Sequence, residues 1–384
     1  MTLRVLHAVA SVGDSYGGVA AAVAALGELE ARLRHDATLV TVHRPEEGGR
    51  ILRDLPLWFD LELVPPGRFA GRFHGSVRLK STLDRLVPQH DLVAVHGVFD
   101  LTAQLCGRTA RQYAVPYLLW PHGSLDPYDL RKHAWAKRRL APLWRETLAG
   151  AAAVVCTTAR EADRLVGFGA DPRRTVLPLP VPAAAPDPRS VARRACGLPD
   201  GGRIVLFLGR IDEKKGLPLL LDAFGRAAGP GDVLVVAGAG DDRLDQELRL
   251  AAARRTGPGR VVFTGWADAA RRRDLLAAAD VFALLSDNEN FGVAVAEALA
   301  AGVAVLVSDE VYLGDDLAPE GAAVVTRRDP AAAGKALRDL LADDRRRQTI
   351  GAAGRAWARR ELDDTRIGDR YQQLVKEVLA RWSA

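Results

Sequence analysis

The sequence predicts an α/β protein with two doubly wound domains whose parallel sheets face a central cleft. Three observations support this fold class. The 384 residues exceed what one hydrophobic core usually fills. Short apolar runs alternate with helical stretches in both halves, a pattern typical of parallel strands covered by helices on both faces. A proline-rich stretch separates the halves, and ligands of such sheets bind beyond the carboxyl ends of the strands.

Hydrophobic patterning places the elements of the N-terminal half. Apolar runs bounded by Gly, Pro or polar clusters predict buried strands, and longer Ala- and Leu-rich stretches predict helices. We expect strands at 3–9, 37–42, 92–96, 117–120, 153–156 and 175–179. We expect helices at 17–30, 77–86, 102–112, 129–148 and 159–166, with an irregular piece at 45–72.

The stretch between Pro178 and Pro188 ends the first domain, because proline fixes φ and removes a backbone donor. The alternation then restarts. We expect strands at 204–208, 233–237, 261–264, 281–284, 303–308 and 323–325, and helices at 217–227, 242–253, 269–278, 293–301 and 329–341. The predicted division is an N-terminal Rossmann-like domain at 1–182, a C-terminal Rossmann-like domain at 183–365, and a C-terminal helix at 366–384 that packs back on the first domain.

Composition narrows the class of protein. Hydrophobic residues make up 48% and charged residues 26%, as in globular proteins. The N-terminus is too quickly polar for a signal peptide, and the three cysteines lack the spacing of metal ligands, so we expect a cytoplasmic protein. The net charge of +5 comes with no nucleic-acid motif, so we expect no nucleic-acid partner.

The first candidate binding segment follows the strand at 204–208. Arg210 lies just beyond the strand, and Lys215 and Gly216 precede a helix. Arginine offers forked hydrogen bonds and lysine a mobile charge, so this pair can bind a diphosphate. A solvated loop is the alternative interpretation.

The second candidate segment is SDNENFGVAVAEALAAG, at 286–302. Gly292 would let the backbone approach a ligand, and the amides around Val293 would open a helix whose N-terminus suits a phosphate. Glu289 and Glu297 can each accept paired hydrogen bonds from a sugar diol. The alternative is that Glu297 only solvates its helix, but its neighbours are apolar, which indicates that the carboxylate has a partner.

The motifs GR-x4-KG at 209–216 and E-x-FG-x4-E at 289–297 together resemble the signatures of the family 4 retaining glycosyltransferases (glycosyl transferases group 1), which have the GT-B fold. The resemblance implies that Arg210 and Lys215 neutralise the diphosphate of a sugar nucleotide. It also implies that Glu289 contacts the donor sugar and that Glu297 binds the ribose. The turn beside the phosphates then consists of Asn290, Phe291, Gly292 and Val293.

Two further segments extend the resemblance. Trp266 follows a strand-ending glycine, where the family places a residue near the nucleotide base; ordinary packing is the alternative. Gly17 and Gly18 match a Gly-Gly pair that approaches the donor phosphate across the cleft, and a plain helix entry is the alternative. The loop lacks the G-x-G-x-x-G fingerprint, so an NAD-dependent oxidoreductase is not predicted.

Two His-Gly pairs end consecutive strands, at His96 and His122. A histidine on an apolar strand is often a core residue, which is the alternative for both. However, HGSLDP followed by a basic helix resembles one subgroup of the family. That resemblance implies a catalytic His122 near the reacting hexose, together with Glu289, and a His96 that lines the acceptor side. Asp126 either contacts the acceptor or forms a turn before Pro127.

The helix expected at 129–148 is strongly basic. Its cations face either solvent or anionic phosphates. The second interpretation predicts peripheral contact with the inner face of an anionic membrane, or contact with a lipid-linked acceptor. The cations are Arg131, Lys132, Lys137, Arg138, Arg139 and Arg145. One departure from the family is the linker at Leu179–Pro182, Leu-Pro-Val-Pro, which replaces an Asn-Gly-Val-Asp-like segment and stiffens the hinge.

These observations predict a metal-independent hexosyltransferase, and the resemblance implies that it retains the anomeric configuration. It would move a hexose from a UDP- or GDP-linked donor to an acceptor hydroxyl in glycan, polysaccharide or glycolipid assembly. No cofactor is expected, because cations and helix amides supply the positive charge that the leaving diphosphate needs. Two alternatives remain at this stage: a catalytically silent sugar-nucleotide-binding subunit and a sugar-nucleotide epimerase.

Overall fold

The computed structural model describes residues 2–13, 16–43, 55–67, 77–166, 168, 173–181, 188–255 and 257–382. The chain divides into two compact units. Unit 1 comprises Met1–Pro180 with Asp364–Ala384, and unit 2 comprises Val181–Asp363. The first unit therefore recruits the C-terminal segment of the chain. Pro182 of the expected linker lies outside the described residues.

Unit 1 is built on a parallel sheet of seven strands in the order β3-β2-β1-β4-β5-β6-β7. Its strands are β1 (Arg4–Val9), β2 (Asp36–Val42), β3 (Asp60–Val64), β4 (Leu92–His96), β5 (Tyr117–Trp120), β6 (Ala153–Cys156) and β7 (Arg174–Val176). Its helices are α1 (Gly17–Arg32), α2 (Val77–Leu86), α3 (Leu101–Gln112), α4 (Pro127–Arg131), α5 (Ala134–Arg139), α6 (Ala141–Ala149), α7 (Ala159–Arg164) and α16 (Asp364–Trp382), with short 3-10 turns η4 (Leu55–Leu57) and η6 (Val87–Gln89).

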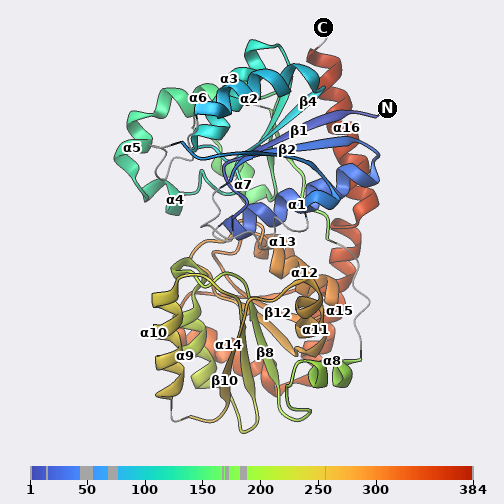
Figure 1. Cartoon of the computed structure of the whole chain (residues 1–384). Helices are drawn as coiled ribbons and strands as arrows, with labels where there is room; N and C mark the ends of the chain where they lie inside the picture. Colours follow the sequence, from blue (N-terminus) through green and yellow to red (C-terminus); the bar gives the residue numbers. More distant parts are fainter. Residues whose placement is uncertain are drawn as a thin grey trace. The chain divides into compact units, whose positions relative to one another are not determined.

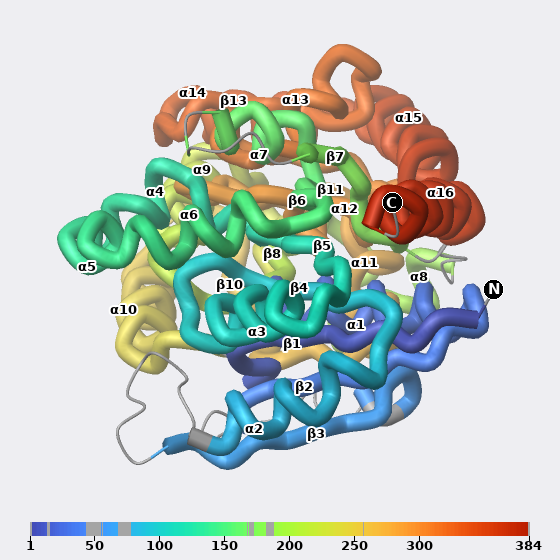
Figure 2. Tube along the Cα trace, turned by 90° about the horizontal axis from the view of Figure 1, so that it is seen from above, coloured from blue at the N-terminus to red at the C-terminus, as the bar shows by residue number. Residues whose placement is uncertain are grey.

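Strand alternation divides the core of unit 1 between the two faces of the sheet. Leu6 and Ala8 of β1 belong to the cluster that also contains residues of α2, α3 and α6, whereas Val9 belongs to the cluster with α1. Helices α2 and α3 lie side by side (Figure 2). On the other face α16 packs against α1, where Gly368 lies close to Leu29 and Leu33.

Unit 2 repeats the architecture with six parallel strands in the order β10-β9-β8-β11-β12-β13. Its strands are β8 (Ile204–Leu208), β9 (Val233–Ala237), β10 (Arg260–Gly265), β11 (Val281–Leu284), β12 (Ala304–Ser308) and β13 (Val324–Thr326). Its helices are α8 (Arg189–Ala195), α9 (Leu217–Ala227), α10 (Asp242–Ala253), α11 (Ala269–Ala278), α12 (Val293–Ala301), α13 (Gly314–Leu317), α14 (Pro330–Ala342) and α15 (Asp344–Glu361), with the 3-10 turn η7 (Glu213–Lys215). Helices α9, α10 and α14 lie on one side of the sheet, and α8, α11, α12 and α15 lie on the other (Figure 1).

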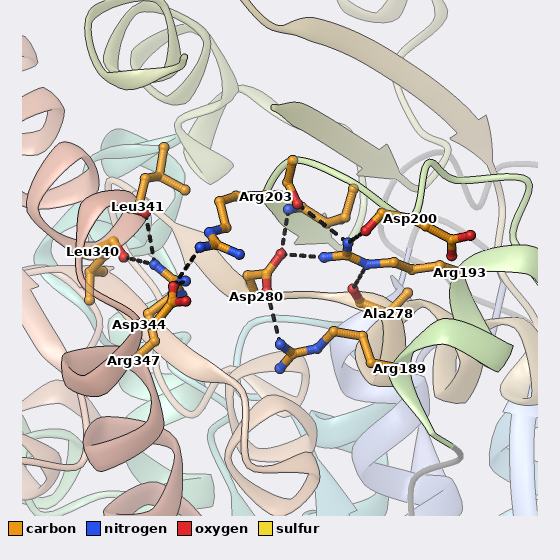
Figure 3. A network of polar contacts seen from close by, with 12 residues as sticks. Arg189, Arg193, Asp200, Arg203, Ala278, Asp280, Leu340, Leu341, Asp344 and Arg347 are labelled. Carbon is orange, nitrogen blue, oxygen red and sulfur yellow. Dashed lines mark hydrogen bonds and ion pairs between the residues drawn. The ribbon is translucent and has the colours of Figure 1, made fainter. Parts of the chain in front are cut away.

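A buried carboxylate fastens α8 to the amino-terminal edge of the second sheet. Asp280 accepts hydrogen bonds from Arg193 Nη2 at 2.6 Å, from Arg189 Nη1 at 3.0 Å and from the amide of Ile204 at 2.7 Å (Figure 3). Nearby, Asp344 pairs with both Arg203 and Arg347 (Figure 3). The side chains of Arg193 and Asp280 are almost completely buried, so their pairing is a condition for burying either one.

The helix expected at 129–148 is wrong as a single element. The structure has three short helices there, α4, α5 and α6. His133 adopts a left-handed φ of 53° between α4 and α5, and a proline, Pro142, lies in the first turn of α6. A proline in a helix interior removes a hydrogen bond and clashes with the preceding turn, so the helix ends and restarts there.

Strand β3 was not predicted. Within the described ranges, no helix is both long and apolar enough to cross a bilayer.

Candidate functional site

The loops that leave β8 and β9 are pressed together at the carboxyl edge of the second sheet. A Cβ at Gly238 would lie 1.8 Å from the carbonyl oxygen of Gly209, and one at Gly240 would lie 2.0 Å from that of Ile211. The amides of Gly209 and Ile211 donate to backbone oxygens of the other loop. Gly238 and Gly240 are therefore required by this backbone contact, which fixes where the β8 loop leaves the sheet.

The β8 loop presents the two predicted cations. Arg210 pairs with Asp212 at 2.9 Å, and Asp212 also accepts from the amide of Lys214. Gly216 follows with φ 68°, and a Cβ on it would lie 1.9 Å from the oxygen of Leu285. Only glycine fits both constraints, so this turn holds Lys215 against the loop that follows β11.

Lys215 forms an ion pair with Glu289, although the two residues are 74 positions apart in sequence. The side chains are 16% and 15% exposed. Burial opposes ionisation of Glu289, but Lys215, Lys214 and Arg210 outweigh it and hold the pKa of this carboxyl below its ordinary value. The two cations and Glu289 therefore form one electrostatic cluster.

The backbone of Glu289 is tied to the loop after β12. Its amide donates to the oxygen of Glu310 and its oxygen accepts from the amide of Tyr312, both at 2.9 Å. Asn288, one residue earlier, donates its side-chain amide to the Tyr312 hydroxyl at 3.0 Å, and both side chains are buried. Sequence reasoning missed this brace. The only signal was a polar residue in the loop that follows a buried strand, four positions after Leu284.

Gly292 turns the chain into helix α12. It caps the helix with φ 71°, and Phe291 before it is buried. The first intrahelical bonds run from the amides of Val295 and Ala296 to the oxygen of Gly292. The amides of Val293 and Ala294 precede those bonds, as in every helix N-terminus, and are oriented to bind an anion. Asn290 lies between Glu289 and this turn.

Glu297 has a partner on the neighbouring helix. Arg272 of α11 lies 3.3 Å from its carboxylate, and the Glu297 side chain is 21% exposed. Burial raises the pKa of Glu297, and Arg272 offsets part of that effect. The expectation that this carboxylate needs a partner was sound, but Arg272 could not be singled out from the run of arginines at 271–273.

Trp266 lies directly after β10 and is 38% exposed. The preceding Gly265 adopts φ 70° and accepts a hydrogen bond from the amide of Gly238. More than a third of the Trp266 side chain is exposed, so a flat aromatic surface is offered at the same edge of the sheet.

In unit 1, His122 has an unusual backbone. Its φ is 51°, a left-handed value that is uncommon outside glycine, and Gly123 follows at 76°. The buried carboxylate of Glu161 holds this turn: it accepts from the amides of Gly123 at 2.6 Å and of Thr157 at 2.8 Å. Strained backbone held by a buried group is characteristic of functional sites. Burial lowers the pKa of His122 to about 4.

His96 does not line a surface, contrary to the prediction. It is 1% exposed, because it belongs to a central strand beneath α1 and its ring lies between those of His7 and His122. Its Nδ1 is 2.9 Å from Nε2 of His122. Burial lowers its pKa well below the ordinary value, helped by the other two rings. His96 therefore contacts the predicted catalytic histidine and not an acceptor.

The described contacts of unit 1 explain Asp126 but do not explain Gly17 and Gly18. Asp126 caps α4 by accepting from the amide of Tyr128 at 2.7 Å and lies 3.6 Å from Arg164, so the turn-forming role is the one filled. Gly17 and Gly18 open α1, and among the described atoms none lies within 4 Å of a Cβ built on either. The packing of unit 1 does not itself require these glycines.

Two family models match the chain. The model "Glycosyl transferases group 1" matches residues 189–357, and the model "Glycosyl transferase 4-like domain" matches residues 17–180. Together they cover most of both units.

Curated relatives match parts of the chain. The D-inositol 3-phosphate glycosyltransferase of Xylanimonas cellulosilytica is 33% identical over 256 residues, 62% of this chain and 60% of that protein. The phosphatidyl-myo-inositol mannosyltransferase of Mycobacterium tuberculosis is 42% identical over 124 residues, 31% of each chain. The 2-deoxystreptamine N-acetyl-D-glucosaminyltransferase of Streptomyces fradiae is 30% identical over 284 residues, 68% of this chain and 66% of that protein. The chain thus matches less than two thirds of the length of each of these relatives.

Solved structures extend the similarity of fold to nearly the whole chain. HepE of Anabaena in complex with UDP and glucose has a TM-score of 0.81 at 17% identity, covering 98% of this chain and 100% of that one. WaaG, a glycosyltransferase involved in lipopolysaccharide biosynthesis, has a TM-score of 0.73 at 16% identity, covering 97% and 99%. At these identities the similarity establishes the fold.

Proposed function

Because the chain belongs to the group 1 glycosyltransferases of GT-B fold, we propose that it transfers a hexose from a nucleoside-diphosphate sugar to an acceptor hydroxyl with retention of configuration. The observation that carries the proposal is the cluster of Lys215, Glu289 and Arg210 at the carboxyl edge of the second sheet. It combines a carboxylate that can bind sugar hydroxyls with cations that can bind phosphate.

The reaction requires charge to move onto the leaving group. The bond between the anomeric carbon and the phosphate oxygen breaks, and its electron pair leaves with the nucleoside diphosphate. The acceptor oxygen bonds to the anomeric carbon and its proton passes to the departing phosphate. Arg210, Lys215 and the amides at the start of α12 supply fixed positive charge where the negative charge develops. This supply supports a metal-independent reaction.

The remaining donor contacts are assigned as the resemblance implies. Glu289, kept ionised by its cations, accepts hydrogen bonds from the hexose hydroxyls. Glu297 accepts from the ribose diol, and its pairing with Arg272 orients it. Trp266 stacks on the base of a UDP- or GDP-linked donor. His122, in unit 1, contacts the hexose.

We assign the acceptor to glycan or glycolipid chemistry, with a peripheral membrane contact at the cytoplasmic face. Some relatives are named for phosphatidyl-inositol acceptors. In the α4–α6 segment, Trp135 is 71% exposed, and Leu140 and Leu143 are 43% and 39% exposed among basic residues. Exposed tryptophan and leucine beside cations favour an anionic lipid surface. Cosedimentation with vesicles containing anionic lipid should exceed that with neutral vesicles, and Trp135→Ala should lower it. Equal binding to both, or none to either, would refute the contact.

The proposed activity is tested with a panel of nucleotide sugars. A donor that binds only the folded state should raise the melting temperature of the wild type, and radiolabelled donor should be hydrolysed or transferred to acceptor. Glu289→Gln should retain fold and lose transfer. If a donor stabilises the protein but neither hydrolysis nor transfer follows with any acceptor, the chain is a silent binding subunit. Interconversion of the donor sugar without release of the nucleotide would indicate an epimerase.

A further inference from the structure

Three imidazoles form a continuous hydrogen-bonded row through unit 1. His7 lies on β1, His96 on the adjacent β4, and His122 just after the next strand, β5. Nδ1 of His7 is 3.1 Å from Nε2 of His96, and Nδ1 of His96 is 2.9 Å from Nε2 of His122. The rings are stacked, with centroids 5.3 and 5.2 Å apart. His7 and His96 are both 1% exposed, so no bulk water enters the row between them.

An ionised carboxylate closes the inner end of the row. Burial alone would raise the pKa of Glu30 on α1, but its hydrogen bonds with His35 and Tyr371 and its charge interaction with His7 outweigh burial and lower the pKa to about 2. Nδ1 of His35 lies 2.5 Å from one oxygen, and the Tyr371 hydroxyl donates to the other. Nε2 of His7 lies 3.7 Å from Glu30, beyond hydrogen-bond length but within the range of a direct charge interaction. A carboxylate can only accept, so the His7 nitrogen that faces it is the one that carries hydrogen.

That single assignment determines every ring in the row. With hydrogen on Nε2, a neutral His7 has a lone pair on Nδ1 and must accept from Nε2 of His96. His96 then has its lone pair on Nδ1 and accepts from Nε2 of His122. With a neutral His7, the opposite order would point its Nε2 lone pair at a buried negative charge. We propose that Glu30, His7 and His96 act as positioning residues that set the tautomer of His122, leaving its Nδ1 as a hydrogen-bond acceptor.

The proposal rests on the proposed function in that it names what His122 can bind. A neutral imidazole whose Nε2–H is already given to His96 has only a lone pair to offer a ligand. It therefore takes a hydroxyl hydrogen of a sugar and not a phosphate oxygen. The lowered pKa of His122 agrees with this, since a neutral ring does not attract phosphate. The division of labour follows: unit 1 presents an acceptor for a hydroxyl, and the phosphate-binding cations belong to unit 2.

Nuclear magnetic resonance tests the tautomers directly. Long-range ¹H–¹⁵N correlations in histidine-labelled wild-type protein should show the Nε2–H tautomer for His7, His96 and His122, assigned with single His→Gln variants. An Nδ1–H tautomer at His122 would overturn the proposal, whatever the activity. The tautomers are read from the wild type, and the variants serve only to assign its signals.

Two variants, one at Glu30 and one at its hydrogen-bond donor Tyr371, test whether the charge of Glu30 sets the tautomer of His122. Glu30→Gln removes the charge that orients the row, and His122 should then populate both tautomers, with a loss in kcat/KM of about tenfold or more. Tyr371→Phe is the matched control, because it removes another hydrogen bond of Glu30 but keeps the charge. It should leave the tautomer and the activity unchanged. If Glu30→Gln leaves His122 wholly Nε2–H, Glu30 does not set the row. If the tautomers are as expected but neither the wild type nor either variant turns over a donor, the proposed function fails and the tautomer assignment stands.

Discussion

Replacing the two glycines at the start of α1 tests whether they serve ligand binding or folding. Gly17 and Gly18 have helical backbones, and among the described atoms none lies within 4 Å of a Cβ built on either. Replacing both by alanine should therefore cost nothing in the folded state. The unfolded chain loses conformational freedom, so the free energy of unfolding should rise by about 0.4–1 kcal/mol per residue. With an unfolding entropy of about 2.1 cal/mol/K per residue over 384 residues, this total of about 0.8–2 kcal/mol should raise the melting temperature by about 1–2.5 °C.

Transfer activity should change in the opposite direction. If the Gly-Gly backbone must approach the donor phosphate, two methyl groups displace the donor, and a displacement of about 1 Å costs on the order of 100-fold in rate. The assay combines thermal unfolding with kcat/KM for sugar transfer. A matched control lies in the same helix. A Cβ at Gly27 would lie 2.3 Å from the Phe59 ring, so Gly27→Ala should lower stability by about 1–3 kcal/mol through overpacking. A double variant that is destabilised, or that is as active as the wild type, would refute the reasoning.

Substitutions at three further positions follow from the ion pairs and the exposed indole of unit 2. Lys215→Met should remove the stability that ionised Glu289 contributes. Because the folded-state pKa of Glu289 lies below the ordinary 4.5, that stability is present above about pH 4.5 and is lost as the pH falls. The variant's deficit in melting temperature against wild type should therefore be larger at pH 7 than at pH 4. A deficit that is the same at both values would contradict this. Asp280→Asn should lower the free energy of unfolding in urea by about 3–5 kcal/mol, because it leaves the buried charge of Arg193 unpaired, and a loss under 1 kcal/mol would show that the pair is dispensable. Trp266→Phe should keep most of the affinity for the donor and Trp266→Ala should lose it, measured by titration calorimetry; equal affinities would remove the indole from the base site.

The strand ends of unit 2 could be predicted from sequence because the signals are local. Strands β8 and β11 have the expected bounds, since each is a short apolar run bounded by polar residues. The loop residues that follow are also readable, because glycine and charge directly after a buried strand are unusual. The resemblance implied that Lys215 and Glu289 bind the same donor, but their direct ion pair was not predicted.

The partners that orient the site were not predictable, because they are single charged residues on amphipathic helices. Glu161, Arg272 and Glu30 look like ordinary solvent-facing residues in sequence. Which of them turns inward depends on how each helix is rotated against its sheet, and that is a tertiary property. The failure at α4–α6 has a different cause: Pro142 is a local signal that interrupts a helix, and the helix expected at 129–148 ran through it.

The two units fix charge in contrasting ways. In unit 2 a surplus of cations keeps Glu289 ionised despite its burial, whereas in unit 1 burial keeps His122 neutral. Neither group changes its charge near neutral pH, because the shifts move both pKa values away from it. Glu297 differs, since burial raises its pKa from 4.5, so of the two candidate carboxylates it takes up a proton first as the pH falls. Acidification should therefore weaken ribose recognition before it disturbs the contacts to phosphate, and the affinity for a sugar nucleotide should fall earlier than the affinity for pyrophosphate.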